Sequence, residues 1–373
     1  MQLRFFLLCI ICFKSQLSFA FVENVTHGYP ACIACHVSPT GGGLLTEYGR
    51  SLSKEMMSTW GGGDQFAQPF FGLVKEKSGV SLGGDVRTLQ TYLENDNVKR
   101  GDLFFMQRNV EAGVQYENFM FVATAGQTLG PESTPDREKF LSERHYVLWS
   151  VAPTSKIRIG KFRQGFGINI PNHNRFVKNN LGFGSLSETY NFEFSQFYEN
   201  SEVLIGTSLG RIDDPGIEDP RLNEKNFKVS YTHFGSGKSR LGVGALFGES
   251  IDRRRFLFNA NTIMPFAEHW YTIGEINYED SQFASGPGSN IVSVVSLLKV
   301  GHKPFQGLFW YGLFEHSSLD GPGQYNLFSR LGPGVQWLPV PHLNVQIEFT
   351  REFRNTAPSN PTNFAWLLFH VYL

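Results

Sequence analysis

The sequence lacks any uninterrupted apolar run as long as the roughly 18 residues that a membrane-spanning helix needs. Cysteine is also scarce, with 4 among 373 residues, and two of these, Cys9 and Cys12, lie in the apolar N-terminal segment. These scarcities exclude a transmembrane helix. They also confine the cysteine chemistry of the rest of the chain to Cys32 and Cys35.

The N-terminal segment has the composition of an export signal. Arg4 precedes the apolar run Phe5 to Phe13, and the small-x-small sequence Ser18-Phe19-Ala20 follows. A charged start, an apolar middle and a small-residue cleavage site form the layout of a secretory signal peptide. The alternative of an uncleaved anchor is disfavoured because the run, ended by Lys14, is too short to span a bilayer. We expect residues 1–20 to be a signal peptide.

The motif C-I-A-C-H, formed by Cys32, Cys35 and His36, carries the clearest chemistry in the chain. Two thiols at this spacing can add across the two vinyl groups of a haem, and the adjacent imidazole then binds the iron. A redox disulfide, half of a zinc site and chance are the alternatives. We expect one covalent haem c, because the motif occurs once.

The second axial ligand of this haem is open. His27, five positions before Cys32, would give a bis-histidine haem of low potential, whereas Met56 or Met57 would raise the potential. We favour His27. Most of the remaining histidines are expected to be strand or loop residues without iron: His145, His173, His233, His269, His302, His316, His342 and His370.

The residues after the motif fit a small haem-binding segment. Gly41 to Gly43 permit a sharp turn next to a flat macrocycle. Tyr48, Leu52 and Met56 recur every four residues, which predicts one short helix with an apolar stripe. This stripe could pack on the porphyrin or on the remainder of the protein.

The rest of the chain has the composition of a β-barrel of the outer membrane. Aromatics make up 14% of the residues, 35 of the residues are Phe, and the mean hydropathy is only −0.21. The segment 104–116 alternates with period two, and we place Gln107, Asn109, Glu111 and Gln115 on one face. The opposite face is expected to hold Phe104, Met106, Val110, Ala112, Val114 and Tyr116.

Segments of this kind have the length of about 9 to 11 residues that a tilted membrane strand needs. Strands are expected near residues 79–94, 101–117, 119–130, 141–152, 155–165, 188–199, 201–210, 224–235, 239–250, 253–263, 267–280, 290–303, 306–318, 325–338, 342–354 and 362–373. An even number, about 16, suits a closed antiparallel barrel with both ends on the periplasmic side. A large soluble all-β domain is the alternative.

Turn composition indicates which end of the barrel is which. Tight turns are expected at 117–118, 200–201, 235–237 and 339–341, and longer loops at 131–139, 171–186 and 281–289. Short periplasmic turns that alternate with longer outer loops are typical of such barrels. The cluster Arg253 to Arg255 is expected to lie on the solvated rim, with at least one side chain on a different face.

Two stretches resemble known families. The sequence I-R-I-G-K-F-R-Q-G-F-G, from Ile157 to Gly167, resembles a strand and turn of phosphate-selective porins. No arginine ladder like theirs is found elsewhere, so this resemblance implies fold rather than substrate. Residues 27–50, which contain the motif, resemble the single-haem leader of some outer-membrane barrels of Gram-negative bacteria.

These features divide the chain into a signal peptide (1–20), a haem-binding leader (21–65) and an outer-membrane β-barrel (66–373). The favoured function is electron transfer at the outer membrane through the haem. A diffusion porin whose leader is a plug or structural staple is the alternative, and an enzyme with an open haem position is a third. One haem cannot bridge a bilayer about 40 Å thick, so electron transfer would need a redox partner.

The expected surroundings follow from this division. We expect the barrel to contact outer-membrane lipid, and the leader to face the periplasm or the lumen. The redox partner would be a periplasmic protein such as another cytochrome. Small ions or solutes could pass through the barrel, and no nucleic acid is expected to bind.

Overall fold

The structure is a computed structural model, and it describes most of the chain after the N-terminal segment. The predicted signal peptide and His27 lie outside the described residues. The described ranges are 31–74, 78–129, 141–172, 174–213, 221–235, 239–283, 290–321, 324–355 and 360–373.

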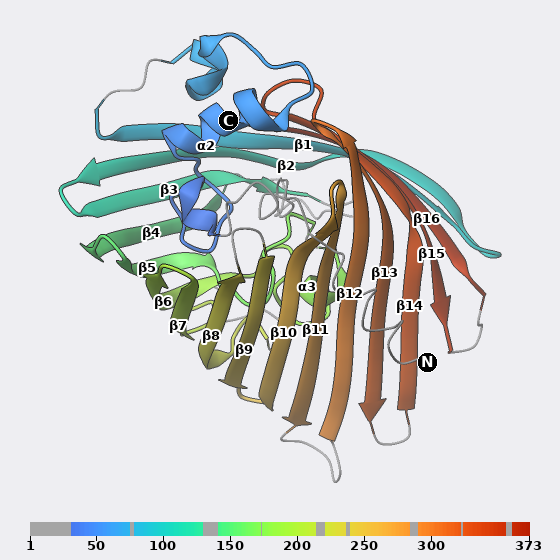
Figure 1. The fold of residues 1–373 in the computed structure, drawn as a ribbon. Coiled ribbons are helices and arrows are strands. Elements are labelled where there is room, and N and C mark those ends of the chain that lie inside the picture. The colour runs from blue at the N-terminus through green and yellow to red at the C-terminus, as the bar shows by residue number, and fades with distance from the viewer. Residues whose placement is uncertain are drawn as a thin grey trace, which may run out of the picture.

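Sixteen antiparallel strands form one closed barrel in which each strand pairs with its neighbours in sequence and β1 pairs with β16 (Figure 1). The expected all-β barrel is therefore confirmed. The strands are β1 (Val80–Glu94), β2 (Lys99–Tyr116), β3 (Phe119–Thr128), β4 (Leu141–Ala152), β5 (Ser155–Arg163), β6 (Glu188–Tyr198), β7 (Ser201–Ser208), β8 (Lys225–Gly235), β9 (Ser239–Glu249), β10 (Arg253–Ala267), β11 (Trp270–Phe283), β12 (Asn290–Phe305), β13 (Leu308–Gly321), β14 (Gln324–Trp337), β15 (Leu343–Arg354) and β16 (Thr362–Tyr372).

The two ends of the barrel differ as the turns predicted. At one end β2 and β3, and β6 and β7, are joined by two residues each. At the other end 24 residues, 164–187, separate β5 from β6. We call these the turn end and the loop end. The last residue, Leu373, lies at the turn end and exchanges backbone hydrogen bonds with Gly84.

Alternation sorts the side chains into an apolar outer face and a polar inner face. On β2, Val110 and Val114 are 56% and 48% exposed and point outward. Asn109 and Glu111, on either side of Val110 in the sequence, are buried inside the barrel. Strands that alternate apolar-out and polar-in are the signature of a transmembrane barrel.

The faces predicted for the segment 104–116 need one correction. Phe104 and Met106 do not share the outer face with Val110, because the pairing of β1 with β2 shifts by one residue between Arg87 and Thr88. Such a β-bulge reverses the facing of every residue beyond it. Met106 is therefore buried against Leu89.

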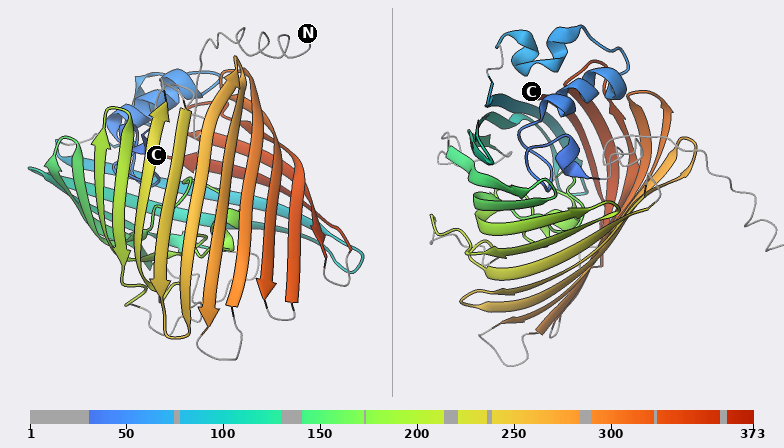
Figure 2. Two further views of the ribbon diagram at one scale, coloured as in Figure 1. Left: turned by 60° about the horizontal axis from the view of Figure 1, so that its bottom comes forward. Right: turned by 60° about the vertical axis from the view of Figure 1, so that its left-hand side comes forward.

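The part of the leader that the structure describes lies at the turn end and reaches into the barrel (Figure 2). It contains a 3-10 turn η2 (Cys32–Ala34), a helix α2 (Glu47–Leu52) and a π-helical turn η3 (Ser53–Met57). Two further 3-10 turns, η4 (Asp64–Ala67) and η5 (Pro69–Gly72), lead towards β1. No helix in the described ranges is long and apolar enough to cross a membrane.

The expected apolar stripe of the leader is only partly correct. Tyr48 is 49% exposed, whereas Leu52 and Met57 are buried. Met56, the third residue of the predicted stripe, is partly buried, and the π-helical turn after Leu52 brings Met57 inward as well. Leu52 and Met57 pack on barrel residues such as Tyr271 and Phe309, so the stripe contacts the barrel wall.

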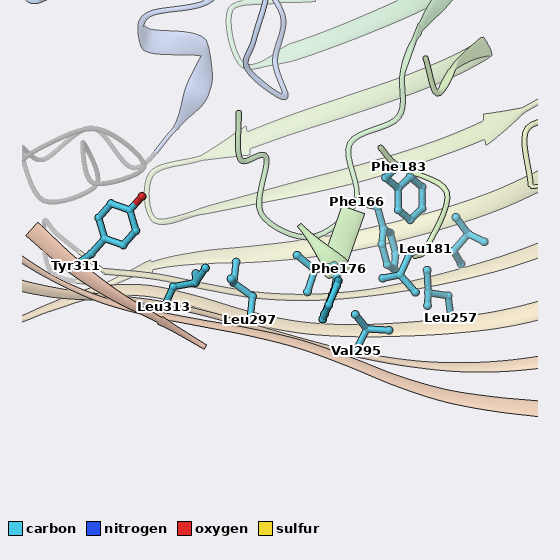
Figure 3. Packing of buried hydrophobic residues seen from close by; sticks show 11 residues of the cluster. Phe166, Phe176, Leu181, Phe183, Leu257, Val295, Leu297, Tyr311 and Leu313 are labelled. Atoms are coloured by element: carbon cyan, nitrogen blue, oxygen red, sulfur yellow. The ribbon is translucent and has the colours of Figure 1, made fainter. Parts of the chain in front are cut away.

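Residues 164–187 form an inserted loop that folds into the barrel and carries the short helix α3 (Phe176–Asn179). Buried wall residues such as Leu257 and Val295 face it from β10 and β12. Figure 3 shows this core, which contains Phe166, Phe176, Leu181 and Phe183 from the loop, and Leu257, Val295, Leu297, Tyr311 and Leu313 from the wall. The loop therefore fills one side of the lumen.

Candidate functional site

The haem-motif residues lie at the base of a hairpin in the leader. His36 pairs with Leu45 across the hairpin, and Thr46 N donates to Cys35 O at 2.9 Å. The tip of the hairpin turns at Gly41 to Gly43, all at positive φ, a conformation that glycine adopts without strain. A Cβ atom at Gly41 would lie 3.2 Å from Cys32 Sγ, so the tip folds back over this thiol.

Buried charges on the barrel wall hold the hairpin. Arg158 of β5 donates to Ser38 Oγ at 2.6 Å and to Thr40 Oγ1 at 3.0 Å. Its charge is balanced by Glu193 Oε1 at 2.6 Å, and Glu193 also accepts from Lys228 Nζ at 2.9 Å. Charge-assisted hydrogen bonds of this kind are among the stronger ones in proteins. The hairpin is therefore fixed to β5, and the acid of β6 and the lysine of β8 support the arginine that binds it.

The inserted loop holds the same hairpin from the lumen side. Asn169 Nδ2 donates to Thr40 O at 2.6 Å. Ile168 packs in the same buried cluster as Leu52 and Met57. The leader is thus enclosed by the wall on one side and by the inserted loop on the other, which closes much of the turn end.

Both motif cysteines are free thiols. Burial raises the pKa of Cys32, although the nearby Arg240 guanidinium opposes this shift. Burial, and then the neighbouring Cys32, raise the pKa of Cys35 to about 11. Arg240 Nη1 lies 3.8 Å from Cys32 Sγ. Both sulfurs are thus held as neutral thiols inside the barrel mouth.

His36 is placed so that its ring is neutral. Burial lowers the pKa of His36 to about 4. Its Nδ1 atom is buried and finds no hydrogen-bond partner among the described residues. A neutral imidazole has a free nitrogen lone pair and is the form that binds a metal.

The three motif residues line one end of a large cavity in the lumen. Its volume is about 760 Å³, which lies within the usual range of about 300–1,000 Å³ for ligand sites. The leader side of the cavity is formed by Cys32, Cys35, His36, Gly41 to Gly43 and Met57. The facing barrel wall contributes Asp85, Arg87, His370 and Tyr372.

The candidates for the distal haem ligand lie in different places in the structure. His27 lies outside the described residues. Met57 lines the cavity, whereas Met56 is half-buried against the apolar cluster that contains Leu52. In the described part of the chain, no group of three or more His, Cys, Asp or Glu side chains is arranged to hold a metal ion.

Beyond the motif the cavity continues towards the loop end between charged and apolar surfaces. The arginines there are paired with carboxylates: Arg87 with Asp85, Arg144 with Glu111, Arg163 with Glu188 and Arg175 with Glu348. An apolar strip lies beside them and consists of Leu89, Phe104, Met106, Phe364, Trp366 and Leu368.

The basic cluster at the start of β10 is divided between two faces, as predicted, so only part of it lies on the rim. Arg254 is exposed and pairs with Glu249, as expected for a rim residue. Arg255 instead points inward, where it is 2% exposed, binds Glu224 and donates to Leu181 O at 2.8 Å. The alternation of β10 explains the split, and Arg255 anchors the inserted loop.

Sequence reasoning found the motif but missed most of its supports. In the sequence, Arg158 is recognisable only as part of a porin-like strand, and no pattern assigns a role to Glu193, Lys228 or Asn169. Period two could have placed Arg158 on the inner face, opposite the exposed Ile159. Their contacts with the leader join residues more than a hundred positions apart, and no local pattern reveals them.

Comparisons with known proteins show the fold. No protein-family model and no curated protein sequence matches the chain. Among solved structures, outer-membrane OmpT of Vibrio cholerae is 12% identical, with a TM-score of 0.59 over 80% of this chain and 99% of that one.

Two other porin-type structures are similar. The outer membrane channel DcaP of Acinetobacter baumannii is 11% identical, with a TM-score of 0.59 over 80% of this chain and 99% of that one. An anion-selective porin from Comamonas acidovorans is 9% identical, with a TM-score of 0.60 over 79% and 99%. The chain therefore has the fold of outer-membrane porins.

Proposed function

We propose that the protein is a porin-type channel of the outer membrane, and that its leader plugs the periplasmic mouth. The observation that carries this proposal is the leader hairpin, held between the wall and the inserted loop, with the cavity of about 760 Å³ beyond it. The apolar outer face of the strands would contact outer-membrane lipid. Small ions or solutes would pass between the paired charges and the apolar strip.

Conductance tests the plug directly. Deletion of residues 21–65 should enlarge the single-channel conductance in planar bilayers, because it removes the hairpin and helix α2 from the mouth. Arg254→Ala is the control, since this side chain is exposed at the loop end, where it pairs with Glu249. An unchanged conductance in a folded deletion variant would show that the leader does not obstruct the channel.

We further propose that the leader carries one covalent haem c and takes part in electron transfer. The carrying observation is that two free thiols and a neutral imidazole line the cavity together. Cys32 and Cys35 would each add their S–H across a vinyl group, which forms a C–S bond and places the hydrogen on the neighbouring carbon. His36 would be the proximal ligand, and His27 or Met57 remains a candidate for the distal position.

When bound, the haem supplies an iron that accepts and returns one electron. The residues of this chain would hold it in place: the glycine-rich tip, which Arg158 fixes, would let the backbone come close to the macrocycle. A redox partner such as a periplasmic cytochrome would reach it from the turn end, because the leader lies there. The signal peptide (1–20), the leader (21–65) and the barrel (66–373) would then act as export signal, redox plug and membrane mount.

Haem staining tests this second function. Thioether bonds survive denaturation, so the denatured wild-type band should keep haem peroxidase activity, and Cys32→Ala with Cys35→Ala should remove it completely. Met56→Ala should keep the stain, because Met56 does not line the cavity. The expected function also requires rapid reduction by a soluble periplasmic cytochrome. A colourless wild-type band from a host that attaches haem would refute the haem.

A further inference from the structure

His370 faces the leader from the last barrel strand. It lies on the inner face of β16, beside Tyr372, and its ring is 5.4 Å from the Tyr372 ring. Its side chain is only 13% exposed. The Nε2 atom is buried and has no hydrogen-bond partner among the described residues. A buried imidazole without a partner is costly unless something binds it.

The carboxylate beside His370 does not satisfy this ring. Asp85 Oδ1 lies 3.8 Å from His370 Nε2, which is too long for a hydrogen bond. Asp85 Oδ1 instead forms an ion pair with Arg87 Nε at 3.3 Å, so His370 Nε2 stays without a hydrogen-bond partner among the described residues.

Two sets of contacts bring this part of the wall close to the haem motif. Tyr372 Oη lies 3.0 Å from Ser53 Oγ at the end of helix α2. On the other side, a Cβ atom at Gly43 would lie 3.1 Å from Arg144 Nη1, and Arg144 pairs with Glu111. His370 and His36 line the same cavity. Hence the end of β16 that carries His370 and Tyr372 contacts the leader and lines the same cavity as the motif.

The two methionines that line the cavity also belong to apolar clusters, unlike His370. Among the described residues, His36 and His370 are the two histidines in the lining. Met57 is buried in the apolar cluster between the leader and the wall. Met106 belongs to the apolar strip with Leu89 and Trp366. Imidazole is also the side chain that most commonly binds metals in proteins.

We propose that His370 is the distal ligand of the haem that Cys32, Cys35 and His36 hold. This assignment rests on the proposed covalent haem and replaces His27, which the sequence favours. The barrel wall, and not the leader, then completes the iron coordination. The haem becomes a link between plug and channel, because the leader supplies one axial ligand and the last strand supplies the other.

Visible spectra of the purified full-length protein test the assignment. The wild type should be low spin in both redox states and should not bind carbon monoxide, as a bis-histidine haem requires. His370→Ala should keep the covalent haem stain, lose the low-spin spectrum and bind carbon monoxide in the ferrous state. Added imidazole should restore the low-spin spectrum.

Three matched variants serve as controls. His316→Ala removes an imidazole of β13 that bonds to Ser329 and does not line the cavity, so the spectrum should not change. His27→Ala and Met57→Ala should also leave the haem low spin. If His370→Ala does not fold, His370→Met keeps a ligand in place and should raise the midpoint potential.

Failure of the proposed haem and failure of the His370 assignment give different experimental results. A wild-type band without haem stain overturns the proposed haem and this assignment with it. A stained protein whose spectrum ignores both substitutions at His370 overturns the assignment alone. A loss of the low-spin spectrum in His27→Ala or Met57→Ala, but not in His370→Ala, moves the ligand to that residue and also overturns it.

Discussion

The absence of a side chain at Gly49 lets helix α2 pack directly against the backbone of the haem motif. A Cβ atom there would lie 2.3 Å from Cys35 O and 3.0 Å from Cys35 Cα. Both are main-chain atoms, so no side-chain rotation can relieve the contact. The spacing of the motif predicts Cys32, Cys35 and His36 as a unit because these residues are neighbours in sequence. It cannot reveal Gly49, whose role depends on how the hairpin folds back.

Gly49→Ala should therefore loosen the leader. Alanine gains up to about 1 kcal/mol of helix propensity over glycine, but overpacking typically costs about 1–3 kcal/mol, so we expect net destabilisation. Limited proteolysis of the folded protein should cleave the leader faster in this variant. Gly61→Ala is the control, since the nearest atom to its Cβ would be Lys54 O at 3.6 Å. Equal cleavage of both variants would contradict the tight contact at Gly49.

At the scale of elements, the strands were predictable and the contents of the lumen were not. Sixteen alternating segments bounded by turn residues predict the sixteen strands, with most boundaries within a few residues. The bulge between β1 and β2 was missed, because period two contains no signal for one extra residue. The inserted loop was expected only as a long loop. Its place inside the barrel depends on distant partners such as Glu275 and Glu315.

The inserted loop shows why such elements escape sequence analysis. Arg175 binds both Glu348 and Glu315, and the backbone N–H of Phe176 donates to Glu315 at 2.8 Å. These acids lie on β13 and β15, about 140 and 170 positions further along the chain. Each buried charge is acceptable only because the fold supplies its partner. In the sequence alone, the same residues look like ordinary polar residues of a strand.

For the whole molecule, the decisive feature is closure of the barrel between its first and last strands. Asp85 to Glu94 of β1 pair in register with residues 363 to 372 of β16, which leaves no free strand edge. Backbone groups at membrane depth have no water to bind, so an open edge there would be costly. The same closure carries His370 and Tyr372 to the leader. Membrane insertion and the coordination proposed for the haem therefore depend on the same strand.

Leu367→Pro in β16 should open this closure. Leu367 pairs with Gln90 on one side and Ile347 on the other, and it lies outside the cavity lining. Proline cannot donate to the ladder, and each backbone group left unpaired costs about 1–3 kcal/mol. Leu367→Ala keeps the N–H and serves as the control. Without heating, the wild type and the alanine variant should migrate as compact barrels on a denaturing gel, whereas the proline variant should migrate as unfolded chain. A compact, heat-modifiable proline variant would mean that the β1–β16 seam does not limit the stability of the barrel.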